Sequence, residues 1–237
     1  MYRFKLMLFV CLFVFQQNSY ASFFGPRENA VIFDGRKSLA TYHIDNANNK
    51  TPWLVQAWVE DASENKTGAF IIAPEVFRVE PSSAFNVRVL KKDEPSAEHE
   101  TLFWVVSHSL PSGNNNNNNN NNIDDGKVSA QLNLAYRFKT PMIYRPAAIA
   151  GSQPKPQLLQ WSVGKEGKVQ IYNPTPYIFH LKHVYVNGKM HKGKGISFLI
   201  LPKEKSLLDI KIKAGESFKY GVINDFGAVK EYEGTMS

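Results

Sequence analysis

The longest regular alternation of apolar and polar residues in this chain covers residues 128–139. The apolar set at every second position is Val128, Ala130, Leu132, Leu134, Tyr136 and Phe138. Polar residues occupy the positions between them, except at Ala135. Because successive side chains of a strand point to opposite faces, the pattern predicts one long β-strand with a single apolar face. It is about twice as long as an ordinary strand of ~5–6 residues.

Two interpretations of this strand are open. An apolar face on an extended backbone is most often the core-facing side of an ordinary sandwich strand. The same face can complete the sheet of another protein by strand addition, in which the backbone gives affinity and alternate side chains fill pockets. Alternation by itself favours the core-facing interpretation.

The rest of the chain is a series of short apolar or alternating runs separated by turn residues. The runs cover residues 30–33, 39–44, 53–60, 70–72, 77–79, 85–90 and 102–106, and then 158–163, 169–172, 179–186, 198–201, 207–212 and 218–223. Asp34-Gly35 and Asn187-Gly188 are turn pairs between them. Without a convincing amphipathic helix, this density of strands predicts an all-β protein built from sandwiches.

Two breaks in the pattern predict the domain organisation. A loop is expected over residues 113–126, because nine consecutive asparagines (114–122) cannot bury apolar area. A boundary is expected where Pro146 ends a strand and small residues follow. We therefore predict an N-terminal sandwich over residues 22–146 and a smaller C-terminal sandwich over 147–237.

The first 21 residues are typical of a secretory signal peptide. Arg3 and Lys5 precede a short apolar run, and small residues lie at the expected cleavage site before Ser22. The only cysteine, Cys11, lies in this segment, so the mature chain would hold no disulfide and no thiolate site. The segment implies export, and no later run is long enough to cross a membrane.

Charge and residue chemistry exclude several function classes. The whole chain carries a formal charge of +7, but its basic residues are spread out and do not form a nucleic-acid footprint. His180 and His183 fall on opposite faces of a predicted strand, so we expect no metal site. No catalytic or cofactor motif is present, and we expect neither an enzyme nor a bound cofactor.

Six motifs in fixed order resemble one family. They are Leu54-Val55-Gln56-Ala57-Trp58-Val59-Glu60, Phe77-Arg78-Val79-Glu80-Pro81, Glu100-Thr101-Leu102-Phe103-Trp104, Ile143-Tyr144-Arg145-Pro146-Ala147-Ala148, Tyr172-Asn173-Pro174-Thr175-Pro176-Tyr177 and Ile223-Asn224-Asp225-Phe226-Gly227. Together they are similar to the periplasmic pilus-assembly chaperones of the chaperone–usher pathway, the PapD-like family. The resemblance implies two immunoglobulin-like β-sandwich domains joined at an angle, with a cleft between them.

The resemblance also implies a non-enzymatic function in the periplasm. Such a chaperone lends a strand to incomplete pilus (fimbrial) subunits, adhesin included, and delivers them to an outer-membrane usher. The donor strand would be the alternating segment, with Val128, Ala130, Leu132, Leu134, Tyr136 and Phe138 filling the subunit groove. A self-capping homodimer remains open. The competing hypothesis is an exported two-domain immunoglobulin-like binding or adhesion module that uses this apolar face in its own core.

Two residue sets are implied by the resemblance alone. In the family, an Arg and a Lys anchor the subunit's C-terminal carboxylate, but those positions hold Ala30 and Pro141 here. We expect Arg27 and Lys139 to replace them as a displaced pair, with a β-bulge at Pro141. A second set, Glu100, Arg145 and Asp225, matches the family's interdomain salt bridge.

Overall fold

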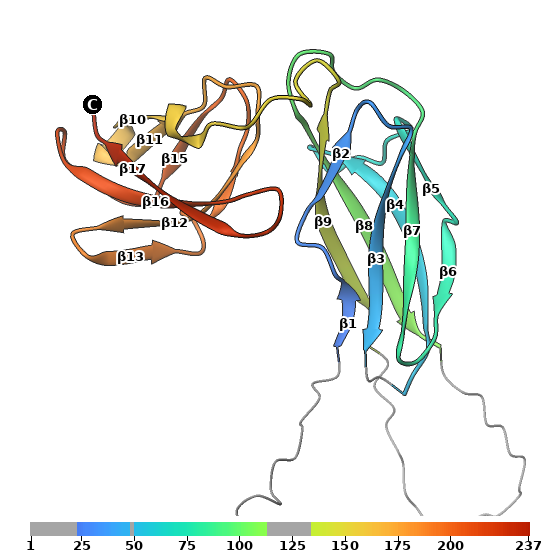
Figure 1. Ribbon diagram of the computed structural model, residues 1–237. Coiled ribbons are helices and arrows are strands. Elements are labelled where there is room, and N and C mark those ends of the chain that lie inside the picture. Colours follow the sequence, from blue (N-terminus) through green and yellow to red (C-terminus); the bar gives the residue numbers. More distant parts are fainter. Residues whose placement is uncertain (1–22, 48–49, 113–133) are drawn as a thin grey trace, which may run out of the picture.

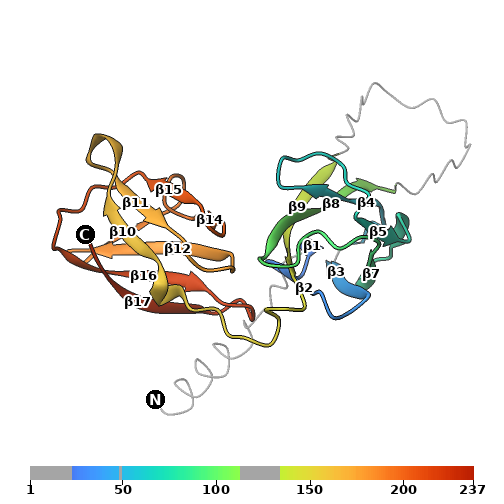
Figure 2. The ribbon, with the colours of Figure 1, turned by 90° about the horizontal axis from the view of Figure 1, so that it is seen from above.

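The computed structural model describes residues 23–47, 50–112 and 134–237. The predicted signal peptide, most of the predicted loop, and Val128, Ala130 and Leu132 lie outside these ranges. The described chain is mostly β-strand with almost no helix, and it forms two sandwiches that lie side by side (Figures 1 and 2). No helix among the described residues is long and apolar enough to span a membrane.

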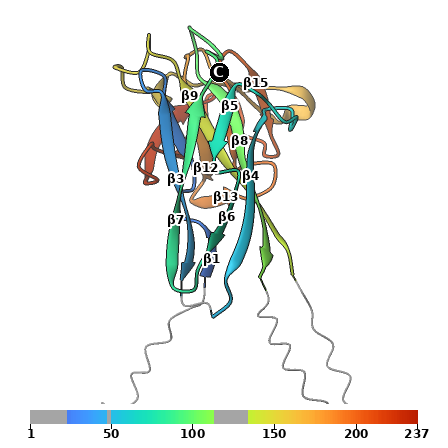
Figure 3. The ribbon, with the colours of Figure 1, turned by 90° about the vertical axis from the view of Figure 1, so that its right-hand side faces the viewer.

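The N-terminal sandwich has two sheets. The first has the strand order β1-β3-β7-β5, with β1 at Phe23–Pro26, β3 at Leu39–Ala47, β7 at Ser83–Lys91 and β5 at Phe70–Ala73. The second has the order β2-β9-β8-β4-β6, with β2 at Val31–Asp34, β9 at Tyr136–Arg145, β8 at Thr101–Pro111, β4 at Trp53–Asp61 and β6 at Val76–Val79. In Figure 3 this sandwich lies in front of the C-terminal domain, and its long strands run vertically.

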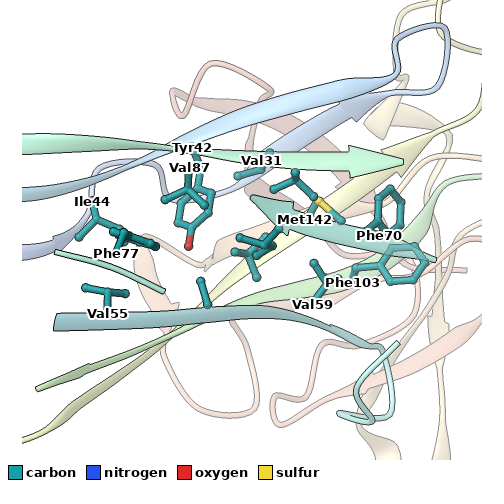
Figure 4. Close-up of a cluster of buried hydrophobic side chains, with 14 of the residues drawn as sticks. Val31, Tyr42, Ile44, Val55, Val59, Phe70, Phe77, Val87, Phe103 and Met142 are labelled. Atoms are coloured by element: carbon teal, nitrogen blue, oxygen red, sulfur yellow. The ribbon is translucent and has the colours of Figure 1, made fainter. Parts of the chain in front are cut away.

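Alternate side chains of both sheets fill the space between them (Figure 4). Tyr42 and Val87 from the first sheet meet Val55 and Met142 from the second, and all four are fully buried. Tyr42 also shares a hydrogen bond with Ser107, 2.8 Å between the hydroxyl oxygens, which satisfies two polar groups inside this core. The period-two pattern of the sequence thus becomes one face of each sheet.

The C-terminal domain is a smaller sandwich. One sheet has the order β10-β11-β15, with β10 at Gln160–Val163, β11 at Val169–Tyr172 and β15 at Lys205–Leu208. The other has the order β13-β12-β16-β17, with β14 paired to β12. These strands are β13 at Lys189–Lys192, β12 at Phe179–Val186, β16 at Ser217–Ile223, β17 at Val229–Thr235 and β14 at Phe198–Ile200. Two short 3₁₀ turns, Pro156–Leu158 and Lys165–Gly167, complete the domain.

Several strand predictions need correction. β9 begins at Tyr136 and runs to Arg145, so its described part lies further along the chain than the predicted strand at 128–139. The strand expected at 207–212 is β15, which starts and ends earlier. The sequence analysis also missed three strands. β1 is only four residues long and contains Gly25 and Pro26, whereas most residues of β13 and β17 are exposed, so that these two strands show weak alternation.

The bulge expected at Pro141 was wrong. β9 pairs with β8 in one unbroken antiparallel register, in which Pro141 faces Trp104. A proline needs no bulge on an edge strand, because its missing N–H then removes no ladder hydrogen bond. Pro141 therefore indicates that this part of β9 is an edge of the sheet.

Candidate functional site

The main feature of the N-terminal domain is an edge of β9 that is only partly covered. β8 pairs with one side of β9 from Tyr136 to Tyr144. On the other side, β2 pairs in parallel only with Met142 to Arg145. Within the described chain, residues 136–141 therefore have no strand partner on that side (Figure 1). Such an edge presents backbone N–H and C=O groups to which a further strand can pair.

The apolar face of β9 changes from buried to exposed along the strand. Met142 and Tyr144 are fully buried in the domain's own core. Phe138 is partly buried against that core, whereas Tyr136 is 40% exposed and Leu134, just before the strand, is 52% exposed. One continuous face thus serves the domain's own core at one end and faces solvent at the other.

Aromatic rings support the exposed end of this face. Phe24 of β1 stacks on Trp53 of β4 at 4.3 Å between ring centroids. Tyr136 lies 5.2 Å from the Trp53 ring, and Phe138 lies 6.0 Å from Phe24. Contacts of this kind hold the rings in defined positions, so the exposed end of β9 is firmly supported.

The opposite face of β9 carries two cations that share one buried carboxylate. Arg137 Nη2 donates to Glu60 Oε1 at 2.7 Å, and Lys139 Nζ lies 2.9 Å from Glu60 Oε2. Trp58 Nε1 also donates to Glu60 Oε1, at 2.9 Å. Each cation lies over a tryptophan ring, Arg137 over Trp58 and Lys139 over Trp104. These contacts tie β9 to β4 across β8.

Glu60 is ionised in this setting. Burial raises the pKa of its carboxyl, but hydrogen bonds from Lys139 and Trp58 and the charges of Lys139 and Arg137 outweigh burial, and the pKa falls below its usual value. We did not identify this cluster from the sequence. The signal was the matching spacing of two in Trp58/Glu60 and Arg137/Lys139, which puts each pair on one face of its strand.

The predicted anchor residues Arg27 and Lys139 both have carboxylate partners within the chain. Arg27, between β1 and β2, donates to Asp45 of β3 from Nε at 2.9 Å and from Nη2 at 2.7 Å. Lys139 Nζ contacts Glu64 at 2.9 Å in addition to Glu60. The two side chains therefore reach towards different strands, and the structure does not bring them together.

The three residues of the predicted interdomain salt bridge do lie together. Arg145, at the end of β9, donates from Nε to Glu100 Oε1 at 2.5 Å. On its other side it donates from Nη1 and Nη2 to the two oxygens of Asp225, at 2.7 and 3.1 Å. Glu100 Oε2 also accepts the backbone N–H of Ile178 at 2.6 Å. Glu100 belongs to the N-terminal domain, whereas Ile178 and Asp225 belong to the C-terminal domain, so the network joins both.

Burial acts on both Glu100 and Arg145, but with different outcomes. It raises the pKa of Glu100, although Arg145 and the Ile178 N–H act in the opposite direction. The two carboxylates overcome the burial of Arg145 and raise the pKa of its guanidinium further, so that it stays charged. A charge at this depth is stable only while its partners remain in place.

Apolar residues continue the junction beside this network. Leu102 and Ile143 of the N-terminal domain pack with Ile178 of the C-terminal domain. Next to them lies a cavity of about 300 Å³ between the domains, with Ala30 and Arg27 on its N-terminal side. Among the described residues there is no cluster of three or more metal-ligating side chains.

Comparison with family models assigns both halves of the chain. The N-terminal domain of the pili and flagellar-assembly chaperone PapD matches residues 24–150. The C-terminal domain of the pili assembly chaperone PapD matches residues 154–234. The two matches together cover nearly the whole described chain.

Individual relatives agree with this assignment. The chain is 26% identical over 217 residues to the chaperone protein LpfB of Salmonella typhimurium, covering 89% of this chain and 88% of the relative. It is 24% identical over 202 residues to the chaperone protein FimC of Escherichia coli K12, covering 84% and 78%.

Solved structures establish the same fold. The Pseudomonas aeruginosa CupB2 chaperone matches with a TM-score of 0.71 at 23% identity, over 90% of this chain and all of that one. A chain of the complex between the SafA pilin and the SafB chaperone of Salmonella enterica matches with a TM-score of 0.72 at 24% identity, over 92% and 98%. The chain has two immunoglobulin-like sandwiches joined by a salt-bridge network, and both family models match it in order. This chain therefore belongs to the PapD-like family of pilus-assembly chaperones.

Proposed function

We propose that this protein is a periplasmic chaperone that folds and caps pilus subunits by lending them the open edge of β9. The observation that carries the proposal is the combination of an edge at residues 136–141, which has no strand partner on that side among the described residues, with an apolar face that becomes exposed at Tyr136 and Leu134. A subunit that lacks one strand needs both a backbone partner and apolar side chains, and this segment offers the two together.

Backbone pairing and apolar burial along the donor strand would supply enough free energy to bind a subunit. Backbone hydrogen bonds along the edge would bind any sequence, because they involve no side chains. Burying each large apolar side chain of the donor strand contributes about 1.5–3 kcal/mol. Val128, Ala130 and Leu132 would extend the row of Leu134, Tyr136 and Phe138.

The edge is also protected against unspecific pairing. Charged residues and proline are the usual means of blunting an exposed edge strand, and here Arg137, Lys139 and Pro141 lie along it. The protection leaves the aromatic side chains accessible, so a specific partner can still bind. A second copy of this chain could cover the same edge as a self-capping homodimer.

The proposed role also includes export of this chain to the periplasm and delivery of its subunit. Residues 1–21 would direct the chain to the periplasm and be removed there. Loaded chaperone would then pass its subunit, a pilin or an adhesin, to an outer-membrane usher. Relatives named as fimbrial chaperones support a role in pilus assembly.

We keep Lys139 and Arg27 as proposed anchor residues for the subunit's terminal carboxylate, each at its own position, because the two side chains do not meet in the free protein. Ammonium and guanidinium groups form charge-assisted hydrogen bonds with a carboxylate. Because both side chains have partners in the free protein, a subunit carboxylate would replace Asp45 at Arg27, or the exposed Glu64 at Lys139. We further propose that Glu100, Arg145 and Asp225 fix the angle between the two domains.

Co-expression with pilin subunits from the same genome tests the proposal. We expect a one-to-one complex in periplasmic extracts, lost when Leu132→Glu and Leu134→Glu are combined, because two charges cannot enter an apolar groove. The Lys139→Ala variant tests the anchor separately and should weaken the complex. Capture of no subunit, or equal capture by the double variant, would favour the binding-module hypothesis.

A further inference from the structure

Phe226 is the most exposed large apolar side chain among the described residues. It is 95% exposed, and the next such residue, Val76, is 53% exposed. Phe226 belongs to the loop between β16 and β17. The tip of this hairpin points towards the N-terminal domain (Figure 1). An aromatic ring left almost wholly in water contributes little to the fold, because its apolar area is not buried.

The backbone around this ring is held in place from both sides. Asn224 Oδ1 accepts the N–H groups of Phe226 and Ala228, both at 3.0 Å. Gly227, with φ of 81°, turns the chain and donates to the Asn224 carbonyl at 2.9 Å. Asp225 is fixed by Arg145. An aromatic side chain on a rigid turn loses little entropy on binding, as in the aromatic anchors of protein interfaces.

The ring stands at the rim of the cavity between the domains. Apolar side chains from both domains form one part of its lining, namely Ile32, Ile143, Ile178, Leu199 and Ile223, with Phe226 beside them. Polar and charged residues form the other part, namely Arg27, Glu28, Asn29, His180, Asn224 and Asp225. Its volume of about 300 Å³ is at the lower end of the range for ligand pockets, ~300–1,000 Å³. Such a size suits one or two side chains of a polypeptide.

The open edge of β9 leads to this cavity. β2 takes over the edge from Met142 onwards, with Val31 opposite that residue. A strand added along residues 136–141 must therefore stop before Val31, and its end meets the segment just before β2. Asn29 and Ala30 of that segment line the cavity. The end of a client strand added to β9 would therefore lie beside Phe226.

We infer that Phe226 is a binding residue for the client pilus subunit. Its ring would pack against an apolar side chain at the end of the client strand that is paired to β9. This inference rests on the proposed function and adds a contact from the C-terminal domain. Phe226 and the isoleucine side chains of the cavity would together favour clients with a large apolar residue at that end of the client strand. Interface hot spots are enriched in such aromatic anchors.

The Phe226→Ala variant tests the inference, with the pilin subunit captured by the wild-type chain as the probe. We expect its dissociation constant to rise about tenfold or more, as for loss of a hot-spot side chain. The melting temperature of the free chaperone should stay within about 2 °C, because the ring is exposed. The Phe226→Tyr variant keeps the ring and should bind like wild type.

Leu207→Ala is the matched control, because Leu207 is a half-exposed apolar residue on β15, in the other sheet of the same domain. It should leave binding unchanged. Unchanged affinity of Phe226→Ala, while Tyr136→Glu abolishes binding, would overturn this inference alone. Binding of no subunit by the wild-type chain would overturn the proposed function and this inference with it.

Discussion

At the residue scale, Arg145 depends on the carboxylates around it. Its side chain is largely buried, and Glu100 holds it from the N-terminal domain while Asp225 holds it from the C-terminal domain. Removing one member of a buried pair leaves an uncompensated charge, which typically costs more than the pair contributes. Glu100 is the more critical carboxylate, since it is fully buried and also accepts the Ile178 N–H.

The Glu100→Ala variant should therefore be strongly destabilised. We expect a loss of about 3–5 kcal/mol in the free energy of unfolding, measured by denaturant titration at neutral pH. Glu98→Ala is the control, because Glu98 is exposed two residues away and should change stability by less than about 0.5 kcal/mol. Equal losses in the two variants would contradict the network's role.

Glu60 gives a prediction for acid stability. Its folded pKa lies below the usual value of 4.5, so the folded state binds its proton less tightly than the unfolded state. The resulting stabilisation is complete above about pH 4.5 and disappears as the pH falls through the folded pKa. Glu60→Gln should lower the free energy of unfolding at pH 7 by about 1–3 kcal/mol and flatten its acid dependence.

Unfolding measured between pH 3 and pH 7 checks this expectation. Glu80→Gln is the control, since Glu80 belongs to an exposed pair with Arg78 worth about 0–1 kcal/mol. An acid dependence for Glu60→Gln as steep as that of the wild type would show that the cluster does not stabilise the folded state.

At the scale of the element, β9 divides into two parts with different tasks. Met142 and Tyr144 complete the core of the N-terminal sandwich, whereas Tyr136 and Leu134 face solvent beside the open edge. The sequence pattern predicted the strand's alternation and its apolar face, because a spacing of two depends only on backbone geometry. It did not predict where the strand enters the core, which depends on how far β2 covers the edge.

Alanine substitutions should separate the two parts. Met142→Ala should cost about 2–5 kcal/mol of unfolding free energy, as for other truncations of buried side chains. Tyr136→Ala should cost less than about 1.5 kcal/mol, because only part of its ring is buried, and should instead reduce subunit capture. Denaturant unfolding and co-purification measure the two effects; a severe stability loss in Tyr136→Ala would assign this end of the strand to the core.

At the scale of the whole molecule, the two sandwiches meet through a small apolar cluster and one charged network. Ile143 and Leu102 contact Ile178, and Arg145 bridges to Asp225 beside them. Domain motion is the default expectation unless an interface is large and apolar. We therefore expect the angle between the two domains to depend on these few contacts.

The Asp225→Asn variant should loosen the arrangement without unfolding either domain. Asp225 is partly exposed, so its loss leaves the Glu100–Arg145 pair intact. We expect small-angle scattering to report a broader distribution of interdomain orientations than in the wild type, with little change in melting temperature. A scattering profile identical to that of the wild type at physiological salt would contradict the role of Asp225.

The sequence predicted the architecture better than the binding site. The two sandwiches followed from the strand patterns, whereas the Glu100, Arg145 and Asp225 network was implied by the resemblance to the PapD-like family. The Glu60 cluster and the surroundings of Phe226 were not foreseen, because they depend on which strands become neighbours and on how the domains meet. Ala30 and Pro141 showed a departure from the family pattern, and the structure places Ala30 in the lining of the cavity between the domains.

Amide hydrogen exchange along β9 tests the central claim most directly. In the free protein, the amides of residues 136–140 that point away from β8 should exchange rapidly, since no strand pairs with them among the described residues. In a complex with a pilin subunit, we expect these amides to be strongly protected from exchange, because the client strand adds to the edge of β9. A stable complex in which their exchange stays as fast as in the free protein would contradict strand lending.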